Sequence, residues 1–184
     1  MYCNSVIIKS NYCRKGKNVI SFIIFSFLVT HISLGQAKND VLHLISDSVT
    51  GKYGYADFKG DTIIPLGKYD ACYTEKFDKF AIVSLSKRGI VGIDRNENIL
   101  FNVYVFDNGP DYPRDGLFRI VKNNKIGYAD LLGNIVIKPQ YDCAYPFKNG
   151  KAKVGFGCKT ANIDEHSWWT GGRWVTINKK GKVI

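Results

Sequence analysis

The stretch that decides the fold is Lys125-Ile126-Gly127-Tyr128-Ala129-Asp130-Leu131-Leu132-Gly133-Asn134-Ile135-Val136-Ile137-Lys138-Pro139, because the chain contains it more than once. An earlier copy reads Lys52-Tyr53-Gly54-Tyr55-Ala56-Asp57-Phe58-Lys59-Gly60-Asp61-Thr62-Ile63-Ile64-Pro65. A weaker copy lies between the two at residues 90–100, and a fourth, partial copy covers residues 173–184. A pattern that recurs along a chain in this way is typical of repeat architectures.

The spacing of the copies defines the repeating unit. Equivalent positions are 38, 35 and 48 residues apart, and they are Gly54, Gly92, Gly127 and Val175. A period of this size indicates an array of small units, each too short to bury its own apolar face. The signal predicts units near residues 52–86, 87–122 and 123–172 and a partial unit at 173–184.

One unit reads as a strand, a turn and two further strands. The first strand is short and rich in aromatic and β-branched residues, as in Tyr53 to Ala56. An Asp-x-x-Gly turn follows, in which aspartate accepts a backbone hydrogen bond and glycine supplies a positive φ, as in residues 130–133. The second strand, such as residues 135–138, is expected to end at proline. A third strand, such as Leu117 to Val121, leads to the next unit.

Three further regularities complete the unit. An aromatic–acidic pair follows the second strand at Tyr69-Asp70, Phe106-Asp107 and Tyr141-Asp142. Two-residue connections, Arg88-Gly89 and Asn123-Asn124, are expected to join the units. Leu42 to Ile45 matches a third strand that precedes the first unit.

The fold class follows from this unit. No window after residue 36 sustains apolar residues at helical spacing, so the chain is predicted to be all-β, built from tandem antiparallel β-meander repeats of about 35 residues. We expect an open, curved array. The alternative is a closed, propeller-like ring, for which three and a half units offer little material.

The first 35 residues have the order of a secretory signal peptide. Basic residues precede the apolar run Val19 to Val29, and the small residues of 33–36 follow it. We predict a signal peptide at residues 1–35, a domain at 36–184 and a protein that is periplasmic, at the cell surface or secreted. The apolar run is shorter than a bilayer span, so no stable membrane span is expected after cleavage.

The net charge argues against one class of partner. The formal charge falls from +10 to +6 without the four basic residues of the leader, and the remaining basic residues are scattered, so nucleic acid is not an expected partner.

Three cysteines follow the leader, Cys72, Cys143 and Cys158, so at most one intramolecular pair can form. We favour the interpretation that they are small buried hydrophobic residues.

No known catalytic or metal-binding motif occurs in the chain. Asp57, Asp94 and Asp130 recur with Asn178 at the fourth equivalent position, which favours turn capping over acid–base catalysis. We therefore predict no enzymatic activity, no cofactor and no metal.

One segment breaks the period. The excess length lies within Gly155 to Gly172 and includes His166, Trp168 and Trp169. Loops on a rigid scaffold often carry function, and the tryptophans, with Trp174, could stack on a sugar ring or bind a peptide. The candidate ligand-binding residues are Trp168, Trp169, Trp174 and His166. Alternatively, a longer hairpin folds back and its tryptophans cover the exposed end of the array.

The repeat resembles the bacterial WG repeat family. The resemblance covers residues 42–184 and is strongest from Gly127 through Asp130, Gly133, Pro139 and Tyr141-Asp142 to Phe147-x-x-Gly150. No copy keeps the Trp-Gly dipeptide itself; the sites read Tyr53-Gly54, Val91-Gly92, Ile126-Gly127 and Trp174-Val175. The resemblance implies an all-β repeat domain, often exported, that mediates binding and has no assigned catalytic residues.

These observations together predict an exported, non-enzymatic repeat module that binds an envelope protein or a surface polymer through its sheet. The alternative is a glycan-binding protein that uses the tryptophans of residues 155–174.

Overall fold

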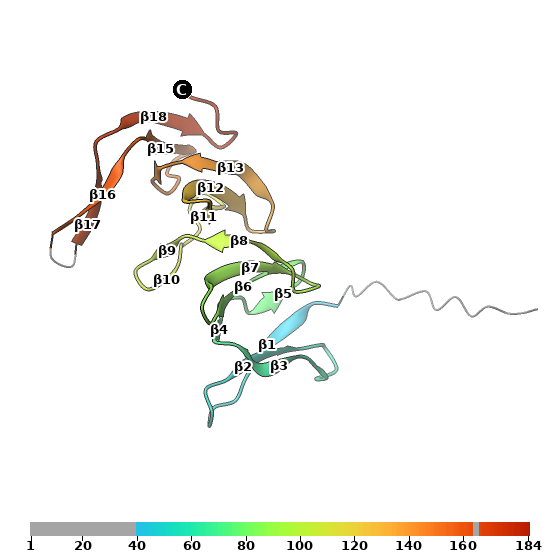
Figure 1. Cartoon of the computed structure of the whole chain (residues 1–184). Helices are drawn as coiled ribbons and strands as arrows, with labels where there is room; N and C mark the ends of the chain where they lie inside the picture. Colours follow the sequence, from blue (N-terminus) through green and yellow to red (C-terminus); the bar gives the residue numbers. More distant parts are fainter. Residues whose placement is uncertain (1–39, 164–165) are drawn as a thin grey trace, which may run out of the picture. The chain divides into compact units, whose positions relative to one another are not determined.

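The computed structural model describes residues 40–163 and 166–184, and within these ranges the chain is all-β, as predicted (Figure 1). The predicted signal peptide, residues 1–35, lies outside the described residues. The strands are β1 (Leu42–Ser46), β2 (Tyr53–Ala56), β3 (Thr62–Tyr69), β4 (Ala71–Cys72), β5 (Lys76–Phe77), β6 (Phe80–Leu85), β7 (Gly89–Asp94), β8 (Ile99–Val103), β9 (Val105–Phe106), β10 (Gly109–Pro110), β11 (Leu117–Lys122), β12 (Lys125–Asp130), β13 (Ile135–Tyr141), β14 (Cys143–Ala144), β15 (Lys151–Phe156), β16 (Lys159–Ile163), β17 (His166–Thr170) and β18 (Arg173–Asn178).

The third strand of each unit pairs with the first strand of the next, as the repeat predicts. β6 pairs with β7, β11 with β12 and β15 with β18, all antiparallel. β1 pairs with β2 in the same way, with Ile45 opposite Gly54, so the prediction that Leu42 to Ile45 is a third strand is confirmed. The largest sheet has the order β13-β12-β11-β8-β7-β6-β4.

The Asp-x-x-Gly turns have the predicted hydrogen bonds. In the turn of the third unit, Asp130 Oδ1 accepts the backbone N–H groups of Leu132 and Asn134, both at 2.9 Å. In the other three turns, the backbone N–H groups two and four residues after the capping residue donate to its side chain in the same way. The capping residues of these turns are Asp57, Asp94 and Asn178. Gly133 has a φ of 83°, and Glu97 adopts a φ of 64° at the equivalent place in the second unit. These side chains therefore cap turns.

The second strand does not end at proline, which corrects our expectation. β3 runs through Pro65 to Tyr69, and β13 runs through Pro139 to Tyr141. Each proline lies where the pairing register shifts. In the first unit, for example, Tyr53 pairs with Tyr69, whereas Tyr55 pairs with Ile64. A bulge leaves a backbone position unpaired, so a residue without an N–H group is tolerated there.

The glycine before each bulge allows the backbone to approach closely. A Cβ on Gly54 would lie 2.5 Å from the carbonyl oxygen of Ile64, and a Cβ on Gly127 would lie 2.5 Å from the nitrogen of Pro139. At Gly92 an aromatic ring takes this space, because a Cβ there would lie 2.5 Å from Phe80. The repeating glycine is thus explained by packing.

Two further expectations for the second unit are wrong. Phe106-Asp107 is not equivalent to Tyr69-Asp70, because it lies in the β9–β10 hairpin and Phe106 is exposed. Tyr104, just before this hairpin, is equivalent to Tyr73 and Tyr145: its N–H donates to Arg119 as Tyr73 donates to Ile82 and Tyr145 to Lys153. The first connection is also longer than predicted, since Leu85 pairs with Gly89 and leaves three residues between them.

Within the described residues the apolar side chains form three separate clusters. The first contains Tyr55 and Phe77 in edge-to-face contact, and the third contains the equivalent pair Tyr128 and Phe147 at 4.7 Å between ring centroids. The middle cluster includes Phe80, Phe101 and Phe118. Successive small cores are what a repeat array requires, because no single unit can bury its face alone.

The sheets are open. Among the described pairings, β1 is joined to β2 and β5, and β18 is joined to β15, so no ladder connects residues 42–45 with residues 174–184. The predicted open arrangement of antiparallel repeats is confirmed, and a closed ring joined through these strands is not formed.

Candidate functional site

Two segments that depart from the repeat pattern line one cleft. The first is residues 104–114, which contains β9 and β10, and the second is the β16–β17 hairpin; both project from the sheets in Figure 1. The cleft has a volume of about 780 Å³. Its aromatic lining side chains are Tyr104, Phe106, Tyr112, Tyr145, Trp168 and Trp169. Asp107, Asp111, Arg114, Arg119 and Thr160 are its polar lining residues.

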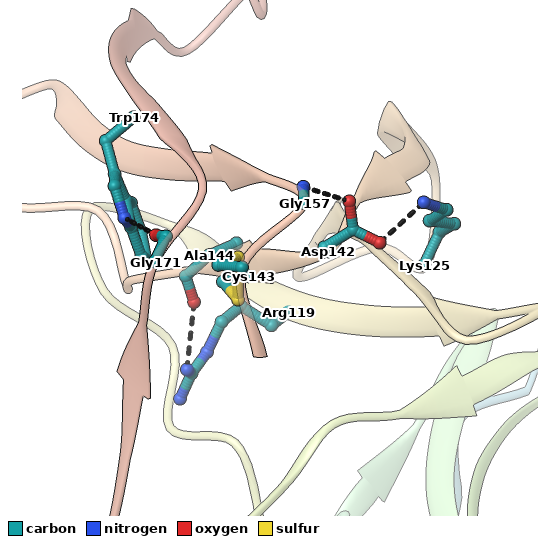
Figure 2. The surroundings of a disulfide bond; sticks show 9 residues. Arg119, Lys125, Asp142, Cys143, Ala144, Gly157, Gly171 and Trp174 are labelled. Carbon is teal, nitrogen blue, oxygen red and sulfur yellow. Dashed lines mark hydrogen bonds and ion pairs between the residues drawn. A yellow bond between two sulfur atoms is a disulfide. The ribbon is translucent and has the colours of Figure 1, made fainter. Parts of the chain in front are cut away.

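The β16–β17 hairpin is fixed at its base (Figure 2). A disulfide joins Cys158, directly before β16, to Cys143 in β14. Next to it, Asp142 Oδ2 accepts the N–H of Gly157 at 2.8 Å, and Asp142 Oδ1 accepts a hydrogen bond from Lys125 Nζ at 2.6 Å. The hydrogen bond from Lys125 and that from Gly157 keep the pKa of the Asp142 carboxyl below its usual range. The cleft wall formed by this hairpin is therefore anchored to the third unit.

The disulfide corrects our interpretation of the cysteines. Cys143 and Cys158 are buried but covalently paired, while Cys72 is a half-buried free thiol. The pairing could not be foreseen from repeat register, because Cys158 lies in the segment that breaks the period.

The structure places the predicted tryptophans in different environments. Trp169 packs against the third apolar cluster and meets the ring of Tyr145 edge-to-face at 5.1 Å. Trp168 is 43% exposed and lines the cleft. The alternative in which the tryptophans cover the array thus describes Trp169, whereas Trp168 is open to a ligand.

Trp174 and His166 lie differently from these two. Trp174 does not line the cleft; its ring lies 6.3 Å from that of Trp169, and its Nε1 donates to the carbonyl oxygen of Gly171 at 2.8 Å. Its role in the structure is to support Trp169 and the hairpin base. His166 is in β17, opposite Ile163, and its side chain lies outside the described part of the chain.

A buried ion pair that sequence reasoning missed forms the base of the cleft. Arg119 and Asp111 are each 3% exposed. Asp111 Oδ2 accepts hydrogen bonds from the backbone N–H of Arg119 at 2.8 Å and from its Nε at 3.0 Å, and Nη2 donates to Oδ1 at 2.5 Å. Arg119 Nη1 also donates to the carbonyl oxygen of Ala144 at 3.1 Å, as Figure 2 shows. The guanidinium thereby links residues 104–116 to the third unit.

An aromatic ring of the cleft also contacts Arg119. The Arg119 guanidinium lies 4.1 Å from the ring centroid of Tyr104, a cation–π distance. Burial raises the pKa of the Tyr104 hydroxyl, and the charge of Arg119 opposes that shift. A sequence signal existed for Arg119, because it alone is charged within the predicted strand Leu117 to Val121.

The cleft offers stacking surfaces and hydrogen-bonding groups. Phe106, Tyr112 and Tyr145 are exposed, as is Trp168. Exposed aromatic rings that gather around one concavity are typical of binding sites. In the part of the chain that the structure describes, no group of three or more His, Cys, Asp or Glu residues is placed to hold a metal, and no helix has the length and apolarity to cross a membrane.

Comparison with known proteins bears on the repeat itself. Residues 126–157 match the family model described as WG containing repeat. The chain carries a WG repeat. The matched segment runs from the second residue of β12 through β15, so the WG repeat supplies both the glycine bulge and one of the disulfide cysteines, Cys143. No match was found among curated proteins or among solved structures.

Proposed function

We propose that the protein is an exported, non-enzymatic binding module whose ligand is a surface polymer, specifically a glycan, bound in the aromatic cleft. The observation that carries the proposal is the set of exposed rings around this cleft, which are Phe106, Tyr112, Tyr145 and Trp168. The apolar face of a pyranose stacks on such rings, and its hydroxyl groups require nearby polar partners.

The polar groups of the cleft suit this ligand. Thr160 and Asp107 line it and can exchange hydrogen bonds with hydroxyl groups. Arg119 and Asp111 already satisfy one another, so the charge at the base is neutralised and fixed in place. A rigid site that combines stacking rings with polar groups needs little reorganisation on binding.

Export is supported by two features. The leader at residues 1–35 has the order of a signal peptide. The Cys143–Cys158 disulfide is of the kind that persists in oxidising compartments outside the cytosol. Cell fractionation, with N-terminal sequencing of the recovered protein, tests this part of the proposal: a cytosolic protein that retains residues 1–35 would contradict it.

The ligand proposal is tested by titration calorimetry with soluble cell-wall glycan fragments and with peptides as the competing class. We expect glycan binding that Trp168→Ala and Tyr112→Ala each weaken at least about tenfold, within the range for losing one stacking platform. Phe58→Ala is the matched control, because Phe58 is also an exposed aromatic residue but lies in a turn of the first unit. Binding of peptides alone, or glycan binding that Trp168→Ala leaves unchanged, would show the proposal to be wrong.

A further inference from the structure

Residues 109–113 also line a second cavity. It has a volume of about 570 Å³ and shares Asp111 and Tyr112 with the aromatic cleft. Its other walls come from the first unit, from β11 and from the turn that follows β12. The cavity is therefore a separate site that the proposed glycan cleft does not explain.

The turn in its wall carries two leucines, whereas each of the other three capped turns carries at least one charged residue at these positions. Leu131 and Leu132 are 59% and 62% exposed. The equivalent residues in the other turns are Phe58-Lys59, Arg95-Asn96 and Lys179-Lys180. The turn is capped by Asp130, so its geometry does not require leucine. Two adjacent exposed leucines at a cavity point to an apolar ligand.

The inner wall of the cavity is rigid and apolar. Phe80 and Phe118 line it with their rings stacked at 5.9 Å and an interplanar angle of 17°. Both side chains are buried, and Phe80 also supports the leucine turn, because a Cβ on Gly133 would lie 2.7 Å from its ring. The two rings therefore support the wall of the cavity from beneath, and the exposed apolar surface is that of Leu131 and Leu132.

The cavity also has a charge preference. Lys76 and Lys79 line it and are exposed, and in the described part of the chain neither takes part in an ion pair. Asp78 is the opposing charge, since the carboxylate of Asp111 is held by Arg119. Two ammonium groups against one free carboxylate favour an anionic group beside the apolar chain.

We propose that this cavity binds a single-chain fatty acid, with the alkyl chain against Leu131, Leu132 and Phe80 and the carboxylate beside Lys76 and Lys79. The site is one cavity and takes one chain, which distinguishes a free fatty acid from a two-chain phospholipid in a bilayer.

The experiment is titration of the full chain with octanoate, decanoate and laurate below their micelle concentrations. Affinity should rise by up to about fourfold for each added methylene, the value for a methylene that leaves water. The cationic analogue dodecyltrimethylammonium should bind more weakly than laurate, and Lys76→Gln combined with Lys79→Gln should remove this preference.

Two changes at Leu132 and two control variants test where laurate binds. Leu132→Asp should lower laurate affinity at least about tenfold, because it places a carboxylate beside the chain, and Leu132→Ser should lower it less. Phe58→Asp, in the equivalent turn of the first unit, and Trp168→Ala, in the aromatic cleft, should leave it unchanged. The proposal is overturned by affinity that does not depend on chain length, by equal binding to Leu132→Asp, by loss of binding in Trp168→Ala, or by binding to phosphatidylglycerol vesicles without binding of laurate.

Discussion

Arg119 Nη2 lies 2.5 Å from Asp111 Oδ1, and both side chains are almost fully removed from solvent. Asp111 belongs to the segment between β10 and β11 that lines both cavities, whereas Arg119 belongs to β11 in the largest sheet. The pair thus holds a functional segment against the scaffold.

Removal of one partner of this ion pair should strongly lower the stability of the fold. Asp111→Ala leaves the guanidinium buried without its carboxylate, beside the carbonyl oxygen of Ala144 and the rings of Tyr104 and Phe106, so we expect a loss of about 3–5 kcal/mol in the free energy of unfolding. The double change Asp111→Leu with Arg119→Met should recover much of this loss. Urea denaturation of the wild type, Asp111→Leu, Arg119→Met and the double variant measures the coupling, and additive effects of the two changes would contradict the argument.

The sequence predicted the scaffold well because repetition makes local patterns reinforce one another. Asp130 fixes its turn by hydrogen bonds within five residues, so an Asp or Asn at this position marks the turn in each of the four copies. Arg119 and Asp111 are different, since their pairing depends on a segment that occurs once. The disulfide at Cys158 and the placement of Trp168 also depend on such a segment, and no repeat register could reveal them.

Gly127→Val tests the close approach of the bulge. A Cβ at this position overlaps Pro139 and the backbone before it, neither of which can move without breaking the β12–β13 pairing. We expect a loss of several kcal/mol, as for an overpacked core. Gly109→Val is the control, because there the nearest atom to a Cβ is 4.0 Å away and φ is not positive. Equal melting temperatures for the two variants would show that the packing of the bulge does not require glycine at position 127.

Asp130 should make the turn sensitive to acid. Burial raises its pKa, but the Asn134 side chain and the backbone N–H groups lower it by more, so the folded pKa is below the unfolded one. Its contribution is present above the unfolded pKa and is lost as pH falls through the folded pKa. Asp130→Ala should cost about 1–2 kcal/mol at pH 7.

Asp130→Asn is the matched variant, because Asn178 already caps the fourth turn with the same two backbone bonds. It should retain most of the stability at pH 7 and lose part of the acid sensitivity below about pH 4, the ordinary aspartate pKa. Thermal melts over this range measure both effects. The capping argument would fail if the alanine and asparagine variants were equally stable at pH 7.

The Cys143–Cys158 disulfide should stabilise the domain and hold the cleft wall. The two cysteines are 15 residues apart, and closing a loop of this length contributes about 3 kcal/mol in the chain-entropy treatment. Reduction should lower the melting temperature and open the β16–β17 hairpin to limited proteolysis. A variant with both cysteines changed to serine should already show these properties and should not respond to reductant.

The last prediction concerns β18, which forms the outer strand of the β14-β15-β18 sheet. It pairs with β15 over six residues and places Ile177, fully buried, in the third apolar cluster beside Val154 and Ala152. Removal of residues 174–184 would expose this cluster and leave the whole edge of β15 unpaired, and an apolar open edge is a template for intermolecular pairing. We therefore expect the truncated protein to aggregate, as measured by light scattering and size-exclusion chromatography. Removal of only Val183 and Ile184, both exposed, is the control and should leave the protein monodisperse. A truncated protein that remains monodisperse and keeps its melting temperature would mean that β18 contributes little to the third core.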